Sequence, residues 1–356
     1  MGLDLFTPQD LYAVMFDPRQ TVATSQWLNL FYPNTFQSTQ EEIRFDKIKA
    51  SRRIAPFMLP NLPGRPIMRN EGETITSFKP AYTKPKDSIR PSENIAMTPG
   101  EISRRLPLMS PQARYDQEVQ RITREHRMAI QRLWEWMAAR ALIDGQITID
   151  YDNGPSVVIS FGRDAAHEIV LGVGARWGDV GVDIFQNLQD WIDIVAAAEF
   201  GGSVTDVLMG AQAAARFLAS DDIKDKLDTN FRGSEGVSIN RGLITVDLLN
   251  PFTLLGTLGS GVRCWRVAGV GNTFQNDDLS TTEILGAKEV LLASPAVDGV
   301  KAYGAILDAD AELNPLPVFP KMWRQQDPSA TFIMSQSAPL MIPVNPNATF
   351  KATVLP

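Results

Sequence analysis

The sequence contains one cysteine and two histidines among its 356 residues. A single cysteine excludes an internal disulfide and any zinc site built from several thiolates. That cysteine, Cys264, lies in the run VRCWRV, which is typical of a β-strand. We therefore expect a buried structural thiol rather than a nucleophile, and no metal or cofactor.

The two histidines offer little for acid–base chemistry. His126 falls on the apolar stripe of an expected helix, and His167 begins a strand-like run. A histidine on such a stripe is more often a satisfied core or interface residue than a catalyst. The sequence also lacks the GxSxG, HExxH and CxxC motifs. We expect no catalytic residue; a hydrolase of undetected type is the alternative from another class of function.

Two glycine-containing segments imitate ligand-binding loops. Residues 172–178, GVGARWG, have the spacing GxGxxxG instead of GxGxxG, and Trp177 would crowd a pyrophosphate. The segment DYDNG lacks the ligand spacing and the terminal glutamate of a calcium-binding EF-hand. The first segment predicts a turn, and the second predicts a β-hairpin around Asn153-Gly154.

Signals for membrane insertion or export are also missing. No apolar run approaches the length of about 18 residues that a membrane-spanning helix needs. The first residues lack a basic segment followed by a continuous apolar stretch, so no signal peptide is indicated. We expect a soluble protein that is made in the cytoplasm and has no membrane partner.

Basic residues are fewer than acidic residues, and the charged residues are unevenly distributed along the chain. The 34 Lys and Arg residues against 41 Asp and Glu give a net charge of −7, which disfavours a general grip on nucleic acid. Residues 41–105 contain thirteen basic and eight acidic residues, whereas residues 181–230 contain three and nine. Regions of opposite sign suit head-to-tail association between copies, and pairing within the chain explains them equally well.

One long helix dominates what the sequence does contain. Ser110 and Pro111 are typical of a helix N-terminus, and neither glycine nor a further proline occurs before Asp144. At 1.5 Å per residue this helix is about 50 Å long. Its apolar side chains repeat every three or four residues and predict one stripe. The stripe consists of Tyr115, Val119, Ile122, His126, Ile130, Leu133, Met137 and Ala141.

Two tryptophans lie near the C-terminal end of this helix. At about 100° per residue, Trp134 and Trp136 fall about 80° on either side of the centre of the stripe and widen the apolar face. Glu135 lies on the far side, where we expect solvent. The apolar residues up to Ile143 fill the remaining directions, so the helix begins amphipathic and ends inside a packed core. We place Leu133, Trp134, Trp136 and Met137 in that core.

Shorter elements on both sides of the helix make the class α+β. Thr7, Pro8 and Asp10 predict a capped helix near the N-terminus. Amphipathic patterns predict helices over 182–199 and 203–220, the latter with Ser203 as its N-cap. From residue 236 onward the chain consists mostly of short strands.

The first hundred residues have less regular patterns. Residues 1–40 indicate an arm whose crowded apolar side chains, Trp27 and Phe31 among them, dock onto the chain's own body or onto a neighbour's. Residues 41–97 mix short alternating runs with prolines and charges. An isolated two-stranded hairpin is only marginally stable in water, so this segment needs a partner surface.

Nine short stretches, spread in order from Leu3 to the C-terminus, resemble the lambda-type phage major capsid protein E family, which has the Hong Kong 97-like capsid fold. The stretches are LDLFTPQDL, RRIAPFM, GRPI, SFKPAYTKPKD, MTPGE, WEWMAARALIDG, FGRD, RWGD and SQSAPLMIPVNPNA. The resemblance implies a non-enzymatic major capsid protein of a tailed phage. Its copies would form the pentamers and hexamers of an icosahedral head, assembled in the host cytoplasm, around double-stranded DNA that is bound without sequence specificity.

The resemblance also implies a division of the chain and a set of partners. The parts are an N-terminal arm (1–40), an extended loop (41–97), a peripheral domain (98–180 and 322–356) with a spine helix (110–144), and an axial domain (181–321). Partners would be a separate scaffold protein, since no long helical segment precedes the arm, a portal and a decoration protein. An encapsulin-like cellular compartment of the same fold is the nearest alternative, and packaged protein instead of DNA would identify it.

The extended loop carries most of our candidates for contacts between subunits, because its basic side chains lack a core of their own. The candidates are Arg52, Arg53, Arg65, Arg69, Lys79, Lys84 and Lys86, together with Trp27 and Phe31 from the arm.

Overall fold

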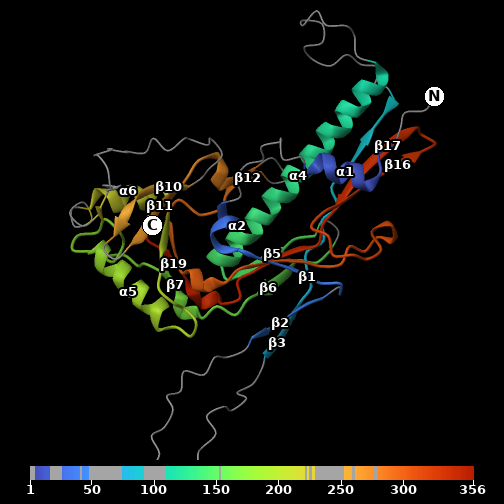
Figure 1. Ribbon diagram of the computed structural model, residues 1–356. Helices are drawn as coiled ribbons and strands as arrows, with labels where there is room; N and C mark the ends of the chain where they lie inside the picture. The colour runs from blue at the N-terminus through green and yellow to red at the C-terminus, as the bar shows by residue number, and fades with distance from the viewer. Residues whose placement is uncertain are drawn as a thin grey trace, which may run out of the picture.

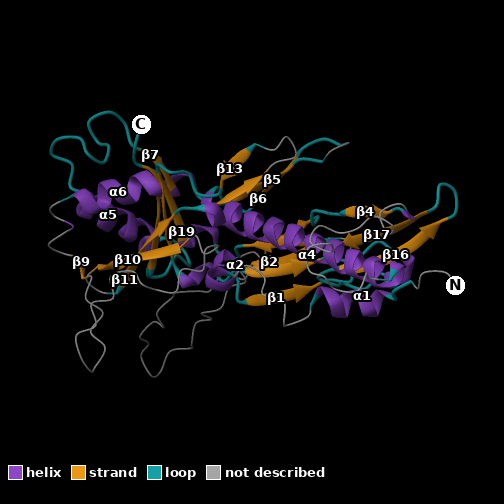
Figure 2. Ribbon diagram, turned by 90° about the horizontal axis from the view of Figure 1, so that it is seen from above, coloured by secondary structure: helices purple, strands orange, loops and turns teal. Residues whose placement is uncertain are grey.

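The computed structural model describes residues 5–16, 26–40, 42–47, 74–91, 110–151, 154–220, 223, 227–228, 252–258, 261–275 and 280–356. Figure 1 shows an elongated molecule, with a broad sheet and two helices at one end and a small sheet at the other. The longest helix runs between the two ends, and the view in Figure 2 shows the same arrangement from above.

The long helix is α4, Pro111–Ile143, and its predicted bounds are confirmed. The Ser110 hydroxyl accepts a hydrogen bond from the backbone N–H of Ala113, which satisfies one of the unpaired donors of the first turn. The helix ends at Asp144, whose backbone N–H donates to the carbonyl of Arg140. The next residue, Gly145, has φ +65°, which places it in the left-handed region that terminates helices and favours glycine.

Two short N-terminal helices pack on α4. Helix α1, Pro8–Met15, begins with the predicted capping box, in which Thr7 and Asp10 each bond the other's backbone N–H. Helix α2, Gln26–Phe31, lies beside the C-terminal half of α4. The arm therefore docks on the chain's own long helix.

A seven-stranded sheet forms the broad end of the molecule, in the order β7-β19-β14-β8-β11-β10-β9. Helices α5 (Ile184–Ala197) and α6 (Ala211–Ala219) cover one face of it, and the other face adjoins the core around α2 and α4. Figure 1 shows both α5 and α6 at this end of the molecule. The strands are β7 Glu168–Val170, β8 Asp206–Gly210, β9 Leu227–Asp228, β10 Phe252–Leu258, β11 Val262–Val267, β14 Glu289–Ala293 and β19 Thr349–Thr353.

The helix expected over 203–220 is wrong in its first half, because residues 206–210 form strand β8 at the centre of this sheet. Every residue of β8 is buried, with Val207 facing α5 and α6 and Leu208 facing the other core. A strand covered on both faces loses the alternation that would reveal it, so its apolar run looks helical. At its end, a Cβ on Gly210 would lie 2.1 Å from the carbonyl oxygen of Gly286, so only glycine fits.

Smaller sheets surround α4. Strands β1-β15-β18 and β16-β17-β4 form two three-stranded sheets, and β2–β3, β5–β6 and β12–β13 form pairs. The pair β5–β6 is the predicted hairpin around Asn153-Gly154, and the strand expected around Ile75 is β3. The strands are β1 Asn34–Gln37, β2 Ile43–Lys47, β3 Thr74–Phe78, β4 Lys86–Ile89, β5 Gln146–Ile149, β6 Val157–Ser160, β12 Thr273–Gln275, β13 Thr281–Glu283, β15 Val300–Tyr303, β16 Phe319–Gln325, β17 Ala330–Gln336 and β18 Pro339–Ile342. Single 3₁₀ turns are η1 Ala165–His167, η2 Val270–Asn272, η3 Pro295–Val297, η4 Ala309–Ala311 and η5 Pro346–Ala348.

The sheets cross the domain limits expected from the sequence. Strands β7 and β19, expected in the peripheral domain, share the seven-stranded sheet with β8 and β14. Strand β15, expected in the axial domain, pairs with β1 and β18 beside α4. The limits at residues 180 and 321 therefore fall within interleaved elements.

Candidate functional site

Three side chains, from α4, β4 and β17, have the connectivity of a catalytic triad. His126 Nε2 lies 2.9 Å from Asp87 Oδ2 on β4, and His126 Nδ1 lies 3.1 Å from Ser335 Oγ on β17. Ser335 is completely buried, so its hydroxyl cannot reach a substrate. The group is therefore a polar tie between α4 and the small sheet, and His126 is the satisfied buried residue predicted from the sequence.

The other histidine also has a structural partner. His167 is buried, and its Nδ1 lies 3.0 Å from the carbonyl oxygen of Thr349. This contact joins the turn before β7 to the start of β19, which is the neighbouring strand. Neither histidine is placed for acid–base catalysis.

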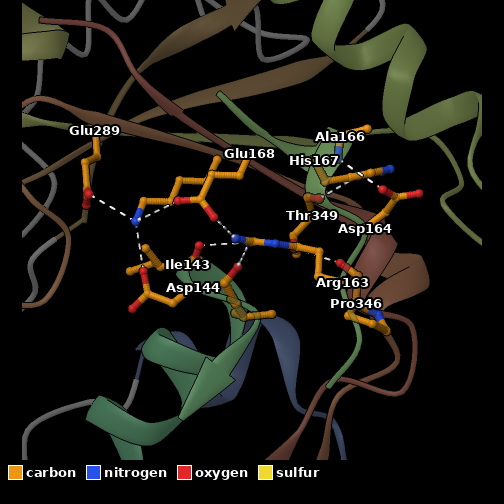
Figure 3. A network of polar contacts seen from close by, with 12 residues as sticks. Ile143, Asp144, Arg163, Asp164, Ala166, His167, Glu168, Glu289, Pro346 and Thr349 are labelled. Carbon is orange, nitrogen blue, oxygen red and sulfur yellow. Dashed lines mark hydrogen bonds and ion pairs between the residues drawn. The ribbon is translucent and has the colours of Figure 1, made fainter. Parts of the chain in front are cut away.

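The most extensive charged network joins the C-terminal end of α4 to the seven-stranded sheet (Figure 3). Lys351 Nζ on β19 lies 2.8 Å from Asp144 Oδ1, 3.2 Å from Glu289 Oε1 and 3.7 Å from Glu168 Oε1. These carboxylates come from the end of α4, from β14 and from β7. One ammonium group therefore bonds three segments that are far apart in the sequence.

Arg163 completes this network from the loop after β6. Its Nη1 donates to the carbonyl oxygens of Leu142, at 3.0 Å, and Ile143, at 2.8 Å, and its Nη2 lies 3.3 Å from Glu168 Oε2. The last carbonyls of a helix have no partner within the helix and carry partial negative charge. The guanidinium group satisfies them and fixes the end of α4 against β7.

The environment of the network changes the proton affinity of its two cations in opposite directions. Burial disfavours the charged ammonium of Lys351, but its hydrogen bond to Asp144 and the charges of Glu289 and Glu168 raise its pKa. Burial lowers the pKa of Arg163, against the opposing effect of Glu168 and Asp144. Both groups stay cationic at neutral pH, so the network holds fixed charges and offers no proton for chemistry.

A buried carboxylate lies at one end of β8. Asp206 Oδ2 accepts hydrogen bonds from the Arg263 guanidinium and the Thr205 hydroxyl, each at 2.7 Å, and Asp206 Oδ1 accepts one from the Trp265 indole at 2.8 Å. Burial, with the nearby charge of Asp206, raises the pKa of Cys264 to about 12. Cys264 is completely buried in β11, which confirms the prediction of an unreactive structural thiol.

The described residues contain no group of three or more His, Cys, Asp or Glu side chains arranged to hold a metal ion. No helix in the same part of the chain is long and apolar enough to cross a membrane.

A shallow hollow of about 470 Å³ lies on α1, and its one charged lining group is Asp10. The hollow is lined by Leu5, Phe6, Asp10, Ala13 and Val14. It lacks the converging polar groups of a substrate site.

The four residues assigned to the core from the sequence lie together in the largest apolar cluster. Trp134 and Met137 are buried, and Leu133 and Trp136 are half-buried and pack against the cluster. Trp134 meets the ring of Tyr303 edge-on, with ring centroids 5.4 Å apart. Trp136 meets the ring of Phe274 edge-on, with ring centroids 6.0 Å apart, so the tryptophan pair of α4 contacts β15 and β12.

Two candidates for contacts between subunits lie instead inside the chain's own core. Trp27 and Phe31 are buried on the face of α2 that meets α4, so they have no free surface for a neighbour. Glu135 was expected to face solvent, but it accepts hydrogen bonds from the backbone N–H groups of Trp27, at 3.0 Å, and Leu28, at 3.4 Å. The first N–H groups of a helix need acceptors, and this carboxylate supplies them to α2.

The basic candidates on the extended loop fall into two groups. Lys79, Lys84 and Lys86 are exposed. The ammonium of Lys84 lies 4.7 Å from the ring centroid of Tyr82, and that of Lys86 lies 4.2 Å from the ring centroid of Phe332. The other four candidates, Arg52, Arg53, Arg65 and Arg69, lie outside the described residues.

The network around Lys351 was not predicted from the sequence. Its carboxylates lie at separations such as 207 residues, between Asp144 and Lys351, and only tertiary structure joins them. Arg163 did have a signal, because it belongs to FGRD, one of the stretches that resemble the capsid family.

Comparisons with known proteins agree with a structural role and not a catalytic one. The sequence model of the family described as phage major capsid protein E matches residues 19–354. The major capsid protein of Escherichia phage N15 is 27% identical over 97% of this chain and 98% of its own length. The major capsid protein of Escherichia phage lambda is 27% identical over 90% of this chain and 91% of its own.

Solved structures share the fold. A crystal structure described as a prophage capsid protein of E. coli CFT073 matches with a TM-score of 0.69 and 18% identity, over 98% of this chain and 99% of that one. The mature capsid of bacteriophage PhiM1 matches with a TM-score of 0.51 and 12% identity, over 94% and 88%. The mixed α+β fold is therefore that of a capsid protein. The chain belongs to the phage major capsid protein E family, and it is a structural protein of the phage virion, not an enzyme.

Proposed function

We propose that copies of this chain form the pentamers and hexamers of an icosahedral head, which encloses the double-stranded DNA of a tailed phage. The family match across residues 19–354 is the observation that supports this most directly. Assembly takes place in the host cytoplasm, with a separate scaffold protein and a portal, and a decoration protein binds the outside of the finished head.

The parts of the chain have distinct roles in this proposal. Helix α4 is the spine of the peripheral domain, and β2–β3 form the base of the extended loop, residues 41–97. Residues 1–40 are the arm, whose helices α1 and α2 pack on α4. The axial domain, expected over 181–321, centres on the seven-stranded sheet and takes in β7 and β19. The peripheral domain, expected over 98–180 and 322–356, takes in β15.

The charge of the chain suits a container for DNA. A net charge of −7 gives weak general attraction for phosphates, so the shell holds the genome loosely and without sequence specificity. A strongly basic lining would bind DNA tightly and slow its release.

The exposed lysines at the base of the extended loop contact neighbouring subunits in this proposal, together with Arg52, Arg53, Arg65 and Arg69. Lys84 stands over the ring of Tyr82 and Lys86 over the ring of Phe332. Among the described residues, neither lysine forms an ion pair with a carboxylate. Their charge is available to the acidic residues of a neighbour, such as those in 181–230.

Electron microscopy of the expressed chain, alone and with its neighbouring phage genes, tests the function. We expect closed particles, and nucleic acid inside those recovered from phage. If no shells form under either condition, self-assembly is refuted; if particles hold an enzyme instead of DNA, they are a cellular compartment.

Charge reversal tests the basic contacts separately. We expect the double variant Lys84→Glu/Lys86→Glu to remain folded and to yield at least about tenfold fewer particles, since like charges replace attraction at each contact. The matched control reverses two exposed arginines elsewhere, Arg132→Glu/Arg266→Glu. Equal particle yields from both double variants would contradict the assignment.

A further inference from the structure

Three of the four most exposed large apolar side chains among the described residues lie close together in the sequence. They are Val170, 71% exposed, Val173, 88% exposed, and Val180, fully exposed. Single exposed aliphatic residues are common, but a concentration of them on a soluble surface marks an interaction site. They belong to β7 and the loop that follows it, residues 168–183.

Strand β7 is the last strand of the seven-stranded sheet. Within the described part of the chain it pairs with β19 alone, through one of its edges. All three of its residues are exposed. The open edge of a sheet presents backbone donors and acceptors that can pair with another chain.

The loop after β7 is held in one shape by its own contacts. The carboxylate of Asp179 accepts hydrogen bonds from the backbone N–H groups of Gly174, at 2.8 Å, and Arg176, at 3.1 Å. The hydrogen bond between Gly174 and the side chain of Asp179 closes the part of the loop that lies between Val173 and Val180. A surface that is ordered before binding loses little conformational entropy on association.

A buried tryptophan anchors this loop to the helices beneath it. Trp177 is 2% exposed, and its ring stacks on that of Trp191 of α5, with centroids 6.1 Å apart. Its backbone N–H donates to the carbonyl oxygen of Val354 at 3.0 Å. The loop therefore has a rigid support, and Figure 2 shows β7, from which it continues, at the end of the molecule away from α1.

Charged side chains on α5 and α6, the two helices that Trp177 contacts, indicate which kind of partner binds the loop. Exposed Asp190 and Asp193 lie on α5, and exposed Arg216 lies on α6, with its guanidinium beside Gly178 of the loop. The carboxylates repel nucleic acid phosphates and anionic lipids. In a head-to-tail contact between identical copies, Arg216 of one copy can meet Asp190 and Asp193 of the next.

We propose that residues 169–180, comprising most of β7 and the closed loop with Val173 and Val180, form an apolar contact with a second copy of this chain. This inference rests on the proposed self-assembly, and it names one surface through which the copies contact each other.

The test replaces the two most exposed valines by glutamate, Val173→Glu/Val180→Glu. The side chains point to solvent in the single subunit, so the melting temperature should match the parent's. Burying two charges at the contact is costly, so we expect the particle yield at equal protein concentration to fall at least about tenfold. The control is Val270→Glu, at another strongly exposed valine (72%) on η2, and it should assemble normally.

The outcomes separate this inference from the proposed function. If the parent chain forms no particles, self-assembly fails and the inference falls with it. If the parent and the double variant assemble equally well, the shell stands and this contact is refuted. If Val270→Glu lowers the yield as much as the double variant does, the loss is not specific to the loop and the contact is also refuted.

Thiol labelling gives a direct second measurement. The natural Cys264 is buried, so a maleimide should react mainly with a thiol introduced by Val180→Cys or, as reference, Val270→Cys. We expect labelling at position 180 to slow at least about tenfold on passing from free subunits to particles, because a buried thiol is out of reach of the reagent. Equal labelling rates at position 180 in subunits and particles would overturn the proposal.

Discussion

The two halves of α4 are stabilised in different ways. The N-terminal half packs one face on a small cluster beneath the three-stranded sheet β16-β17-β4, and its other face lies in solvent. The C-terminal half enters the largest core, where residues 137–139 and 141–143 are all buried. The small cluster consists of Leu11, Ile89, Tyr115, Val119, Ile122 and Ile333. One continuous helix is therefore amphipathic and half-exposed in its N-terminal half, and it is part of the core in its C-terminal half.

This contrast predicts unequal local stability along a single helix. Segments with few buried apolar neighbours open at lower free energy than segments inside a large core. The N-terminal half relies on the polar tie at His126 and on surface ion pairs of Arg121 with Glu118 and Glu125. The C-terminal half combines apolar burial with the network around Lys351. A capsid subunit can thus keep one end of its longest helix fixed while the other end adjusts.

The largest effect is expected at the anchored end. Trp134→Ala removes a buried aromatic side chain that packs against Tyr303, and it should lower the free energy of unfolding by about 3–5 kcal/mol. Denaturant titration measures the loss, and particle yield should fall with it. The control Arg132→Ala, at an exposed position two residues earlier, should change stability by less than about 0.5 kcal/mol. A Trp134→Ala subunit that unfolds like the parent and still assembles would show that the end of α4 is not anchored there.

A smaller loss is expected at the charged network. Lys351→Met leaves three carboxylates without their shared cation, which should cost about 2–3 kcal/mol at this largely buried site. The half-exposed Lys301, replaced in the same way, is the control and should change little. Equal losses from the two substitutions would remove the distinction between the network and an ordinary surface lysine.

The pH dependence of the Lys351 contribution follows from the direction of its pKa shift. The pKa of Lys351 is raised in the folded protein, so its contribution is complete below the unfolded value of about 10.4 and is lost as the pH rises through the folded value. The stability difference between Lys351→Met and the parent should therefore be constant from pH 6 to pH 9.

The smallest of the three losses in the free energy of unfolding is expected in the N-terminal half of α4. His126→Ala removes the hydrogen bonds to Asp87 and Ser335, and it should cost about 1–2 kcal/mol. Hydrogen exchange should show faster opening of β4 and β17, with unchanged protection of Met137 and its neighbours. If protection falls equally in both halves of α4, the helix behaves as one cooperative unit and the contrast is lost.

Elements with short-range signals were predicted well from the sequence. The limits of α4 follow from Ser110, Pro111 and Gly145, and α1 begins with the predicted capping box. The hairpin β5–β6 follows from alternation around Asn153-Gly154. These features depend on residues within a few positions of one another, so local backbone preferences are enough to specify them.

Elements that depend on distant partners were predicted poorly. Strand β8 looked helical because the sheet buries both of its faces. Glu135 looked exposed because the N–H groups that donate to its carboxylate belong to the N-terminus of α2, more than a hundred residues earlier. Trp27 and Phe31 were predicted to contact a neighbouring subunit because nothing in the sequence indicates that the arm folds back on α4.

The sequence by itself therefore determined the class, the long helix and, through short stretches such as WEWMAARALIDG, the membership of a capsid family. Tertiary structure alone decided which charges meet around Lys351, which strands share a sheet, and which valines stay exposed beyond β7. The physical reason is the range of the interactions. Caps, turns and helical periodicity act between near neighbours in the chain, whereas burial and ion pairing depend on segments that only the fold brings together.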